Sequence, residues 1–322
     1  MKAVFLDGRS LDRDDLDFSA LRAAVSSLDI HAVTPASRVQ ERIRGYDVVI
    51  TNKVEINADQ LPDAGPRLIC VAATGINNID MPACAAHGIT VTNCQGYGTD
   101  SVAQHALALM LNLATRMPNY QRAVQHGDWH RSDQFCLLDY PIMELAGKTL
   151  GIVGYGTLGQ RVAELGRAFG MQIRIAARAG ARAETQGGAQ EQRVPLEQLL
   201  PQVDVLSLHC PLTPATRNLI GRHELALMKP SALLINTARG GLVDEAALVE
   251  ALQRGQLAGA GLDVVDGEPP DTDAALFHQP VPGLIITPHC GWAAREARQR
   301  VVAQLAENIV QWQSGYPVRV VT

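Results

Sequence analysis

Three side chains that could work together in catalysis follow short apolar runs in the second half of the chain. Arg239 follows the run that ends at Asn236, Glu268 stands before a proline, and His289 follows Thr287-Pro288. A guanidinium is a planar fork of donors that can hold a carboxylate and polarise a neighbouring carbonyl oxygen. An imidazole can give or take a proton near neutral pH, and a carboxylate bonded to it favours its protonated form. Together these groups could bind a small carboxylic acid and exchange a proton with it.

A glycine-rich turn could bind a dinucleotide. Residues 149–159 read TLGIVGYGTLG, which is an apolar strand, the pattern G-x-G-x-x-G and the start of a helix expected over Leu158–Phe169. Gly154 permits the turn, Gly156 lets the backbone approach a pyrophosphate, and Gly159 allows the helix to pack closely on the strand. A turn of this composition without a ligand is the alternative. The candidate contacts between and beside the glycines are Tyr155, Thr157 and Leu158.

The residues after the next expected strand, Ile173–Ala176, bear on which dinucleotide binds. Ala177 and Arg178 stand where an Asp or Glu usually holds the ribose diol, and Arg182 is near in sequence. Without a carboxylate there is no repulsion against a 2′-phosphate, and a guanidinium can pair with it. The sequence therefore predicts a preference for NADP(H). The alternative is an exposed arginine in a chain that uses NAD(H).

The candidate catalytic residues also have structural interpretations. Arg239 could pair with Asp244 or with the end of a helix, Glu268 could belong to an ordinary turn, and His289 could bond a carbonyl in the core. Asp263, at the end of another apolar run, could cap the next segment. We expect purely structural roles for three further residues, which are His105, His209 and Cys290.

The elements that position these residues are predicted from apolar runs alternating with helical patterns. The runs are continuous, which is typical of parallel strands covered on both faces, and their two series predict two doubly wound α/β domains. The chemically active residues follow strands of the second series, at the edge where open α/β sheets bind ligands. The first series is Val4–Leu6, Ile30–Val33, Val48–Thr51, Leu68–Ala72 and Thr90–Thr92. The second is Leu150–Val153, Ile173–Ala176, Val205–His209, Leu233–Asn236, Ala260–Asp263 and Ile285–Thr287.

The sequence also predicts the structure of three further parts of the chain. Ser101–Thr115 is apolar on nearly every side, which predicts a buried helix between the domains, with Thr99 and Asp100 as N-cap residues. Residues 117–144 lack strong periodicity and predict an arm that packs on a second subunit, or else an excursion over the surface of its own domain. The remaining expected elements are an amphipathic helix over Ala293–Ser314 and a strand over Val318–Val321.

Composition argues against several classes of protein. The 322 residues include 28 Lys plus Arg and 33 Asp plus Glu, without the basic run that a nucleic acid would need. The longest apolar run, Ala106–Ala114, is far shorter than the roughly 20 residues of a membrane span. The first residues do not resemble a signal peptide. The six cysteines are dispersed, and no two of them form a CxxC pair. We therefore expect a cytoplasmic protein with reduced thiols and neither nucleic acid nor membrane as a partner.

As an ordered set, the motifs resemble the D-isomer-specific 2-hydroxyacid dehydrogenases over essentially the whole chain. The matching motifs are ATGINNID at 73–80, GYGTLG at 154–159, NTARG at 236–240, LDVVDGEP at 262–269 and TPHCGW at 287–292. Trp292 and the stretch WHRSDQFC at 129–136 are most similar to the branch of the family that acts on glycerate and hydroxypyruvate.

The resemblance implies hydride transfer between a nicotinamide cofactor and a small 2-keto or 2-hydroxy acid, such as hydroxypyruvate and D-glycerate or glyoxylate and glycolate. Arg239 would bind the substrate carboxylate, and Glu268 with His289 would form the acid–base pair. The other implied substrate contacts are Thr74, Gly75, Ile76 and Trp292. Asp263 would lie near the nicotinamide, and the other implied cofactor contacts are Cys210, Pro211, Thr216, Thr237, Ala238 and Gly291.

The resemblance also implies a domain organisation. A Rossmann dinucleotide-binding domain (100–289, including the arm at 117–144) would be inserted in a flavodoxin-like substrate-binding domain (1–99 and 290–322). Substrate would bind in a cleft that closes, the chain would form a homodimer, and no metal would take part. The alternatives are a D-lactate-type or phosphoglycerate dehydrogenase, or a non-catalytic NAD(P)-sensing protein like the co-repressors that share this fold. The long disordered tails of those co-repressors have no counterpart here.

Overall fold

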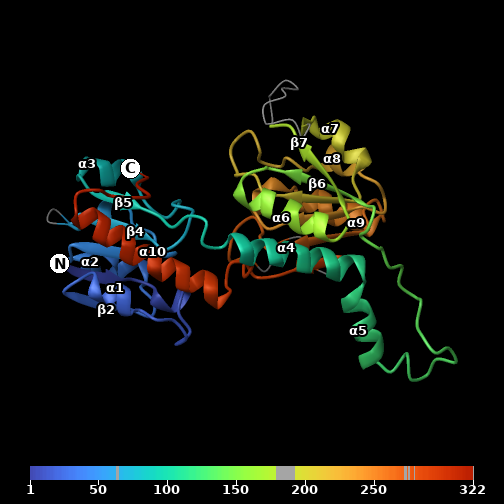
Figure 1. Cartoon of the computed structure of the whole chain (residues 1–322), viewed down its shortest axis with the longest axis horizontal. Coiled ribbons are helices and arrows are strands. Elements are labelled where there is room, and N and C mark those ends of the chain that lie inside the picture. The colour runs from blue at the N-terminus through green and yellow to red at the C-terminus, as the bar shows by residue number, and fades with distance from the viewer. Residues whose placement is uncertain (63–64, 179–192, 272–273, 275, 279, 322) are drawn as a thin grey trace. The chain divides into compact units, whose positions relative to one another are not determined.

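The computed structural model divides the chain into two compact units (Figure 1). Unit 1 comprises Met1–Gly98 and Trp292–Thr322, and unit 2 comprises Thr99–Gly291. The structure describes residues 1–62, 65–178, 193–271, 274, 276–278 and 280–321. The assignment of unit 1 to the substrate and of unit 2 to the cofactor stays a prediction.

Unit 1 is a five-stranded parallel sheet with the order β2-β1-β3-β4-β5, which is the flavodoxin-like order. Its strands are β1 (Lys2–Phe5), β2 (Ser27–Ile30), β3 (Val48–Thr51), β4 (Leu68–Val71) and β5 (Thr90–Thr92). Its helices are α1 (Ser19–Ala23), α2 (Val39–Ile43), α3 (Met81–Ala86) and α10 (Arg295–Gln313).

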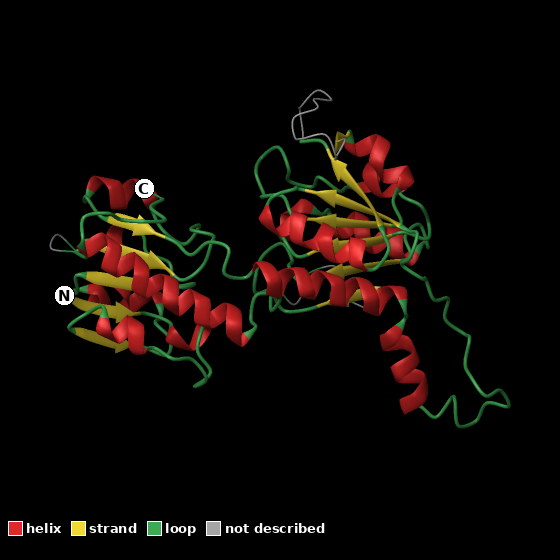
Figure 2. Cartoon of the chain, viewed as in Figure 1, coloured by secondary structure: helices red, strands yellow, loops and turns green. Residues whose placement is uncertain are grey.

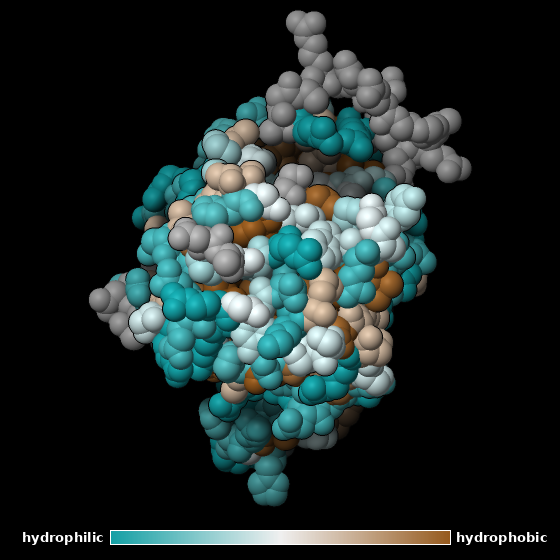
Figure 3. All heavy atoms as spheres, turned by 90° about the vertical axis from the view of Figure 1, so that its left-hand side faces the viewer, coloured by the Kyte–Doolittle hydropathy of each residue, from teal (hydrophilic) through white to brown (hydrophobic). Residues whose placement is uncertain are grey.

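The inner strands β1, β3 and β4 of the unit 1 sheet are buried on both faces, which explains their continuous apolar runs, whereas the edge strand β2 is largely exposed. Alternate residues of β1 enter different cores: Phe5 packs with α1 and α10, and Val4 packs with α2 and α3. Because side chains of a strand point to opposite faces in turn, a strand buried on both sides must be apolar throughout. The surface seen in Figure 3 is mainly hydrophilic, with small and separate hydrophobic areas.

Unit 2 is a seven-stranded parallel sheet with the order β12-β11-β10-β9-β6-β7-β8 and helices on both faces (Figure 2). Chain order reverses between β6 and β9, which makes this the topological switch point where doubly wound sheets bind nucleotides. Its strands are β6 (Thr149–Val153), β7 (Gln172–Ala176), β8 (Arg193–Val194), β9 (Val205–Leu208), β10 (Leu233–Asn236), β11 (Gly259–Leu262) and β12 (Leu284–Ile286). Its helices are α4 (Thr99–Ala114), α5 (Met117–Gln125), α6 (Thr157–Ala168), α7 (Leu196–Leu199), α8 (Arg222–Leu227) and α9 (Glu245–Gln253).

Two cores cover the faces of the unit 2 sheet. Helices α4 and α6 pack on one face, where Leu233 and Ile235 of β10 point, and α7, α8 and α9 pack on the other, where Leu234 points. The predicted fold class, two doubly wound parallel-sheet domains of the Rossmann and flavodoxin-like types, is confirmed. All described strands of both sheets pair in parallel.

Some predictions about individual elements are wrong. The expected strand Val318–Val321 is reduced to a single antiparallel bridge between Val320 and Thr92. Thr99 and Asp100 lie inside α4 rather than at its N-cap, and the two-residue β8 was not predicted. These differences arise at element ends and in very short elements, where one or two hydrogen bonds decide the outcome.

The segment 117–144 begins with a helix that its weak periodicity did not predict. Figure 1 shows α5 and the loop after it projecting from the rest of unit 2. Tyr120 and Tyr140 connect the two limbs, because the Tyr120 hydroxyl donates to the Tyr140 carbonyl at 2.8 Å. Several large apolar side chains of this segment are exposed: Met117, Val124, Trp129, Phe135, Leu138 and Ile142.

Two further observations concern the whole described chain. None of its helices combines the length and the apolar character needed to span a bilayer. All six cysteines are free thiols. Burial raises the pKa of Cys70 to about 12, so this thiol stays protonated at neutral pH.

Candidate active site

His289 and Glu268 form a hydrogen-bonded pair beside the carboxyl ends of β12 and β11. The ring Nδ1 of His289 lies 2.5 Å from Oε2 of Glu268, and about a third of each side chain is exposed. The other carboxylate oxygen, Oε1, accepts the backbone N–H of Val265 at 3.0 Å, which orients the carboxylate. Because Nδ1 is engaged, Nε2 is the ring nitrogen that can exchange a proton with a ligand. The structure thus brings together two of the three predicted catalytic residues.

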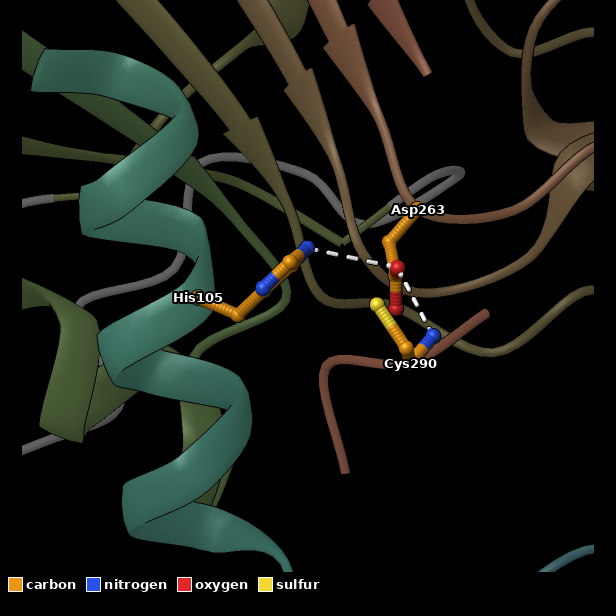
Figure 4. Close-up of side chains that lie close together, drawn as sticks. All are labelled: His105, Asp263 and Cys290. Carbon is orange, nitrogen blue, oxygen red and sulfur yellow. Dashed lines mark hydrogen bonds and ion pairs between the residues drawn. The ribbon is translucent and has the colours of Figure 1, made fainter. Parts of the chain in front are cut away.

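The turn that carries His289 is held by the buried carboxylate of Asp263 (Figure 4). Its Oδ1 accepts the Thr287 hydroxyl at 2.6 Å and the Cys290 N–H at 3.0 Å, and its Oδ2 accepts the Gly291 N–H at 2.8 Å. His289 has a positive φ of 52°, a conformation that such a tightly bonded turn can maintain. Burial alone would raise the pKa of Asp263, but these hydrogen bonds and one from His105 outweigh burial and lower it.

His105 of α4 braces the same turn. Its Nε2 lies 2.8 Å from the Thr287 hydroxyl and 3.3 Å from Oδ1 of Asp263 (Figure 4). The sequence predicts a purely structural role for His105 but not this contact, since the apolar pattern of α4 contains no signal for it.

The same cluster has to be considered as a metal site. The candidate ligand atoms of His105, Asp263 and Cys290 lie within 4.8 Å of one another. However, both carboxylate oxygens already accept hydrogen bonds from Thr287 and the backbone. Burial and the nearby carboxylate also raise the pKa of Cys290, which disfavours the thiolate that a metal needs. We therefore interpret the cluster as a brace for the turn.

Arg239 lies in a turn built by the last residue of β10. Asn236 donates from Nδ2 to the Arg239 carbonyl at 2.8 Å and accepts the Ala238 N–H at 3.0 Å. The exposed Arg239 side chain donates to the Ala238 carbonyl at 2.6 Å, and Asp244 accepts the Ala247 N–H instead of pairing with Arg239. The guanidinium is therefore available to an anionic ligand.

The turn of Arg239 touches the loop of Glu268 directly. A Cβ added to Gly240 would lie 1.9 Å from the carbonyl carbon of Val265 and 2.3 Å from the Asp266 nitrogen. Only glycine can occupy this position without moving the loop. The backbones that carry Arg239 and Glu268 are therefore neighbours.

The glycine turn has the shape that a pyrophosphate requires. Gly154 has a φ of +95°, and a Cβ there would lie 2.5 Å from the Cys210 nitrogen. A Cβ at Gly159 would lie 2.1 Å from the Gly154 carbonyl oxygen, so helix and strand meet closely, whereas the space beside Gly156 is open. Gly156 is also the N-cap of the twelve-residue α6, whose first-turn N–H groups are suited to phosphate.

Two buried polar atoms near the same sheet edge fit a polar ligand. Within the described chain, Oγ1 of Thr237 and Nδ1 of His209 have no hydrogen-bond partner. Buried polar groups are nearly always bonded, so an orphan beside a glycine turn is consistent with a dinucleotide site. Burial lowers the pKa of His209 to about 4, so its imidazole is neutral at neutral pH. The residues present therefore fit a nicotinamide dinucleotide.

The residues predicted to select the cofactor lie at the end of β7. Ala177 donates its N–H to the Val194 carbonyl at 2.7 Å, and Arg178 is exposed. Arg182 lies outside the described residues. Nearer the glycine turn, Thr216 closes the loop after Cys210, because its hydroxyl donates to the Pro211 carbonyl at 2.8 Å.

Four of the predicted substrate contacts lie in unit 1, and these are Thr74, Gly75, Ile76 and Trp292. The Thr74 hydroxyl donates to the Cys94 carbonyl at 2.9 Å, and Asn93 donates to the Thr74 carbonyl, which shapes the turn containing Gly75 and Ile76. Trp292 packs edge-on against Tyr97, with ring centroids 6.4 Å apart. Their roles toward a substrate stay predictions.

A cavity of about 510 Å³ lies at the other edge of the unit 2 sheet. It is lined by residues at the end of α4, in α5, and near the starts of β11 and β12. The lining includes Arg116 between α4 and α5, Tyr140 in the loop after α5, and Gly283 just before β12. None of the predicted catalytic residues lines it. The candidate active site is therefore at the carboxyl edge, where the strand ends and the glycine turn gather.

Comparisons with known proteins agree with this geometry. Residues 107–291 match the family model for the NAD-binding domain of D-isomer specific 2-hydroxyacid dehydrogenases. The chain is 43% identical to a glycerate dehydrogenase of Methylorubrum extorquens, over 99% of this chain and 98% of the relative. It is 37% identical to a hydroxypyruvate reductase of Blautia hydrogenotrophica, over 100% of this chain and 99% of the relative. A crystal structure of a protein from Thermus thermophilus covers all of both chains with a TM-score of 0.86 at 35% identity.

Proposed function

Because this chain belongs to the D-isomer specific 2-hydroxyacid dehydrogenases, we propose that it interconverts hydroxypyruvate with D-glycerate and glyoxylate with glycolate. The observation that carries the proposal is the 2.5 Å contact between His289 and Glu268, at the sheet edge that also holds Arg239 and the glycine turn. The relatives named glycerate dehydrogenase and hydroxypyruvate reductase support the choice of substrates.

His289 is the proposed proton donor in the direction of reduction. Reducing a 2-keto acid adds a hydride to the carbonyl carbon and a proton to its oxygen, and a bound reduced nicotinamide supplies the hydride. The Nε2–H of protonated His289 would give the proton to that oxygen, and the carboxylate of Glu268 would hold the ring in place through Nδ1. In the direction of oxidation the neutral ring would take the proton back.

Arg239 is the proposed anchor for the substrate. Its exposed guanidinium would pair with the carboxylate and place positive charge beside the keto oxygen, where negative charge develops during hydride addition. Backbone N–H groups of Thr74, Gly75 and Ile76 would also bind the carboxylate, and Trp292 would favour small acids. Asp263 would contact the nicotinamide part of the cofactor while holding the turn of His289.

The proposed cofactor preference is NADP(H), with NAD(H) also accepted. Ala177 leaves the end of β7 without the carboxylate that usually binds a ribose diol, and the exposed Arg178 can pair with a 2′-phosphate. Arg178→Asp should reverse the preference, because a carboxylate repels the phosphate and accepts hydrogen bonds from the diol.

A homodimer is the proposed assembly. The segment 117–144 exposes large apolar side chains, with Phe135 at 89% and Leu138 at 82% exposure. Exposed apolar patches of this kind mark interaction sites, and symmetric pairs of one chain are the commonest assemblies. A second copy of the chain would cover the segment.

One assay tests the enzymatic proposal. The purified chain is offered hydroxypyruvate, glyoxylate, pyruvate and a phosphorylated 2-keto acid, each with NADPH and with NADH, and loss of absorbance at the reduced nicotinamide band is followed. We expect the highest kcat/KM for hydroxypyruvate or glyoxylate with NADPH. A higher kcat/KM for pyruvate would favour a D-lactate-type enzyme, and equal or better use of NADH would overturn the cofactor preference.

A further inference from the structure

Glu245 makes an unexpected contact with the loop of Glu268. It is the first residue of α9, which begins shortly after the turn of Arg239, and its Oε1 accepts the backbone N–H of Asp266 at 2.7 Å. Asp266 lies two residues before Glu268 in the same loop. The side chain of Glu245 therefore joins the segment that carries one predicted catalytic residue to the loop that carries another.

Two other contacts hold the same point of the loop. Gly240 packs flat on the peptide between Val265 and Asp266, where any Cβ would collide with the backbone. Arg217 donates from Nη1 to the Asp266 carboxylate at 2.9 Å. Asp266 is thus held through its N–H by Glu245 and through its side chain by Arg217.

The held segment in turn orients the carboxylate of Glu268. The N–H of Val265, the residue before Asp266, donates to Oε1 of Glu268 at 3.0 Å, and Oε2 of Glu268 meets His289. If the backbone at 265–266 rotates, the donor that orients Glu268 moves with it. A chain of hydrogen bonds therefore runs from Glu245 through the loop to His289.

Capping of α9 does not account for Glu245. The N-cap Asp244 already accepts the Ala247 N–H. Burial raises the pKa of Glu245, and the neighbouring carboxylates of Asp266 and Asp244 add to the effect. A carboxylate in a half-buried place beside two other acids is electrostatically unfavourable, which indicates a role that offsets this cost.

We propose that Glu245 is a positioning residue, which holds the loop of Glu268 against the turn of Arg239 and so keeps Glu268 aligned with His289. The inference deepens the proposed function and rests on it for its kinetic part. The acceptor oxygen of Glu245 is the essential feature, because the bond to Asp266 needs an acceptor and not a charge.

Three variants test this role. Glu245→Ala removes the acceptor, Glu245→Gln keeps an acceptor oxygen, and Glu250→Ala is the matched control, since Glu250 is on the same helix and pairs with Arg222 and Arg254 away from the loop. We expect Glu245→Ala to lower kcat for reduction by about 10- to 100-fold with little change in the KM for cofactor, as for a misplaced catalytic group. The pH profile of kcat should change in the same direction in Glu245→Ala as in Glu268→Gln, because both substitutions disturb the contact between the Glu268 carboxylate and His289. Glu245→Gln should stay within about threefold of the wild type, and Glu250→Ala should keep its kcat.

A measurement independent of turnover separates this inference from the proposed function. Histidine ring signals are followed by NMR between pH 5 and 9, and the signal of His289 is identified as the one lost in His289→Asn. Glu245→Ala should move the titration of His289 in the same direction as Glu268→Gln, and Glu245→Gln should not. An unchanged titration in Glu245→Ala would overturn the positioning role whether or not the chain reduces hydroxypyruvate. Lower activity with an unchanged titration and pH profile would make the role of Glu245 merely structural and would also overturn it.

Discussion

At the scale of single residues, hydrogen bonds hold the candidate site in place. His289 uses Nδ1 for Glu268, which leaves Nε2 as the ring nitrogen that could exchange a proton with a ligand. Arg239 has its backbone bonded to Asn236 and its side chain exposed. Asp263 is 3% exposed and directs its carboxylate to the turn of His289. The side chain of His289, the backbone of Arg239 and the turn that follows His289 are thus each held by a neighbouring residue.

His289→Ala should lower kcat for hydroxypyruvate reduction by about 10²- to 10⁴-fold, because the variant lacks the proposed general acid. Steady-state kinetics at saturating cofactor measure the effect. The KM for cofactor should change little, since the glycine turn is untouched. A near-normal kcat would show that another group supplies the proton.

Arg239→Ala should raise the KM for the keto acid and lower kcat together, because in the proposed mechanism one guanidinium binds the carboxylate in the ground state and stabilises charge in the transition state. Arg239→Lys should recover only part of the loss, since an ammonium cannot form the two-pronged contact. The two parameters are measured with hydroxypyruvate. If KM rises at constant kcat, Arg239 binds substrate only.

At the scale of elements, the candidate catalytic residues follow the ends of strands β10, β11 and β12, and the helices pack on the two faces of the sheet that these strands form. The turns after β10, β11 and β12 contact one another because these strands are neighbours in a parallel sheet. In unit 1, α10 is bound to the start of the chain by Arg298, which donates from Nη1 and Nη2 to both carboxylate oxygens of Asp15.

The Asp15–Arg298 pair should make unit 1 sensitive to acid. The hydrogen bond from Arg298 lowers the pKa of Asp15 from 3.8 to about 2. A carboxyl group whose pKa is lower in the folded state stabilises the fold above its unfolded pKa, and this stabilisation is lost as pH falls through the folded value. Asp15→Asn should therefore have a lower Tm than the wild type at pH 7, and the difference should shrink between about pH 4 and pH 2. Thermal melts over this range measure it, and a difference independent of pH would contradict the assignment.

At the scale of the whole molecule, two units with separate cores share one chain. Helix α4 packs within unit 2 against α6, β10 and β11, so the unit has a buried centre of its own. The segment 117–144 has no such centre, and several of its large apolar side chains are exposed, which the proposed dimer would explain.

Replacing Phe135 and Leu138 together with serine should convert the proposed dimer into a monomer, since these side chains are the most exposed large apolar groups of the segment. Sedimentation equilibrium should give twice the mass of one chain for the wild type and the mass of one chain for the variant. Val33→Ser is the control, because Val33 is 62% exposed and belongs to unit 1. A monomeric wild type would contradict the proposed assembly.

Besides the fold class, most of what could be predicted from sequence was local. Val48–Thr51 and Leu233–Asn236 are found as predicted, because a continuous apolar run suits a strand buried on both faces. The glycine turn was also predictable, since a positive φ at Gly154 and the close packing at Gly159 impose the residue type at the position itself. The run at 318–321 forms a single bridge rather than a strand, because Arg319 has a positive φ of 52° and so interrupts the extended backbone.

The sequence by itself determined which residues can do chemistry and that they follow the strands of a doubly wound sheet. The family resemblance already implied that Glu268 pairs with His289, and the structure shows the hydrogen bond between them. Only the tertiary structure revealed that Asp263 meets His105 and that Glu245 meets Asp266. These contacts join residues on separate elements, and their geometry depends on strand order and on loop backbones rather than on any local pattern. Propensity and periodicity act over a few residues, whereas a hydrogen bond between distant elements forms only after the sheet has brought its strand ends together.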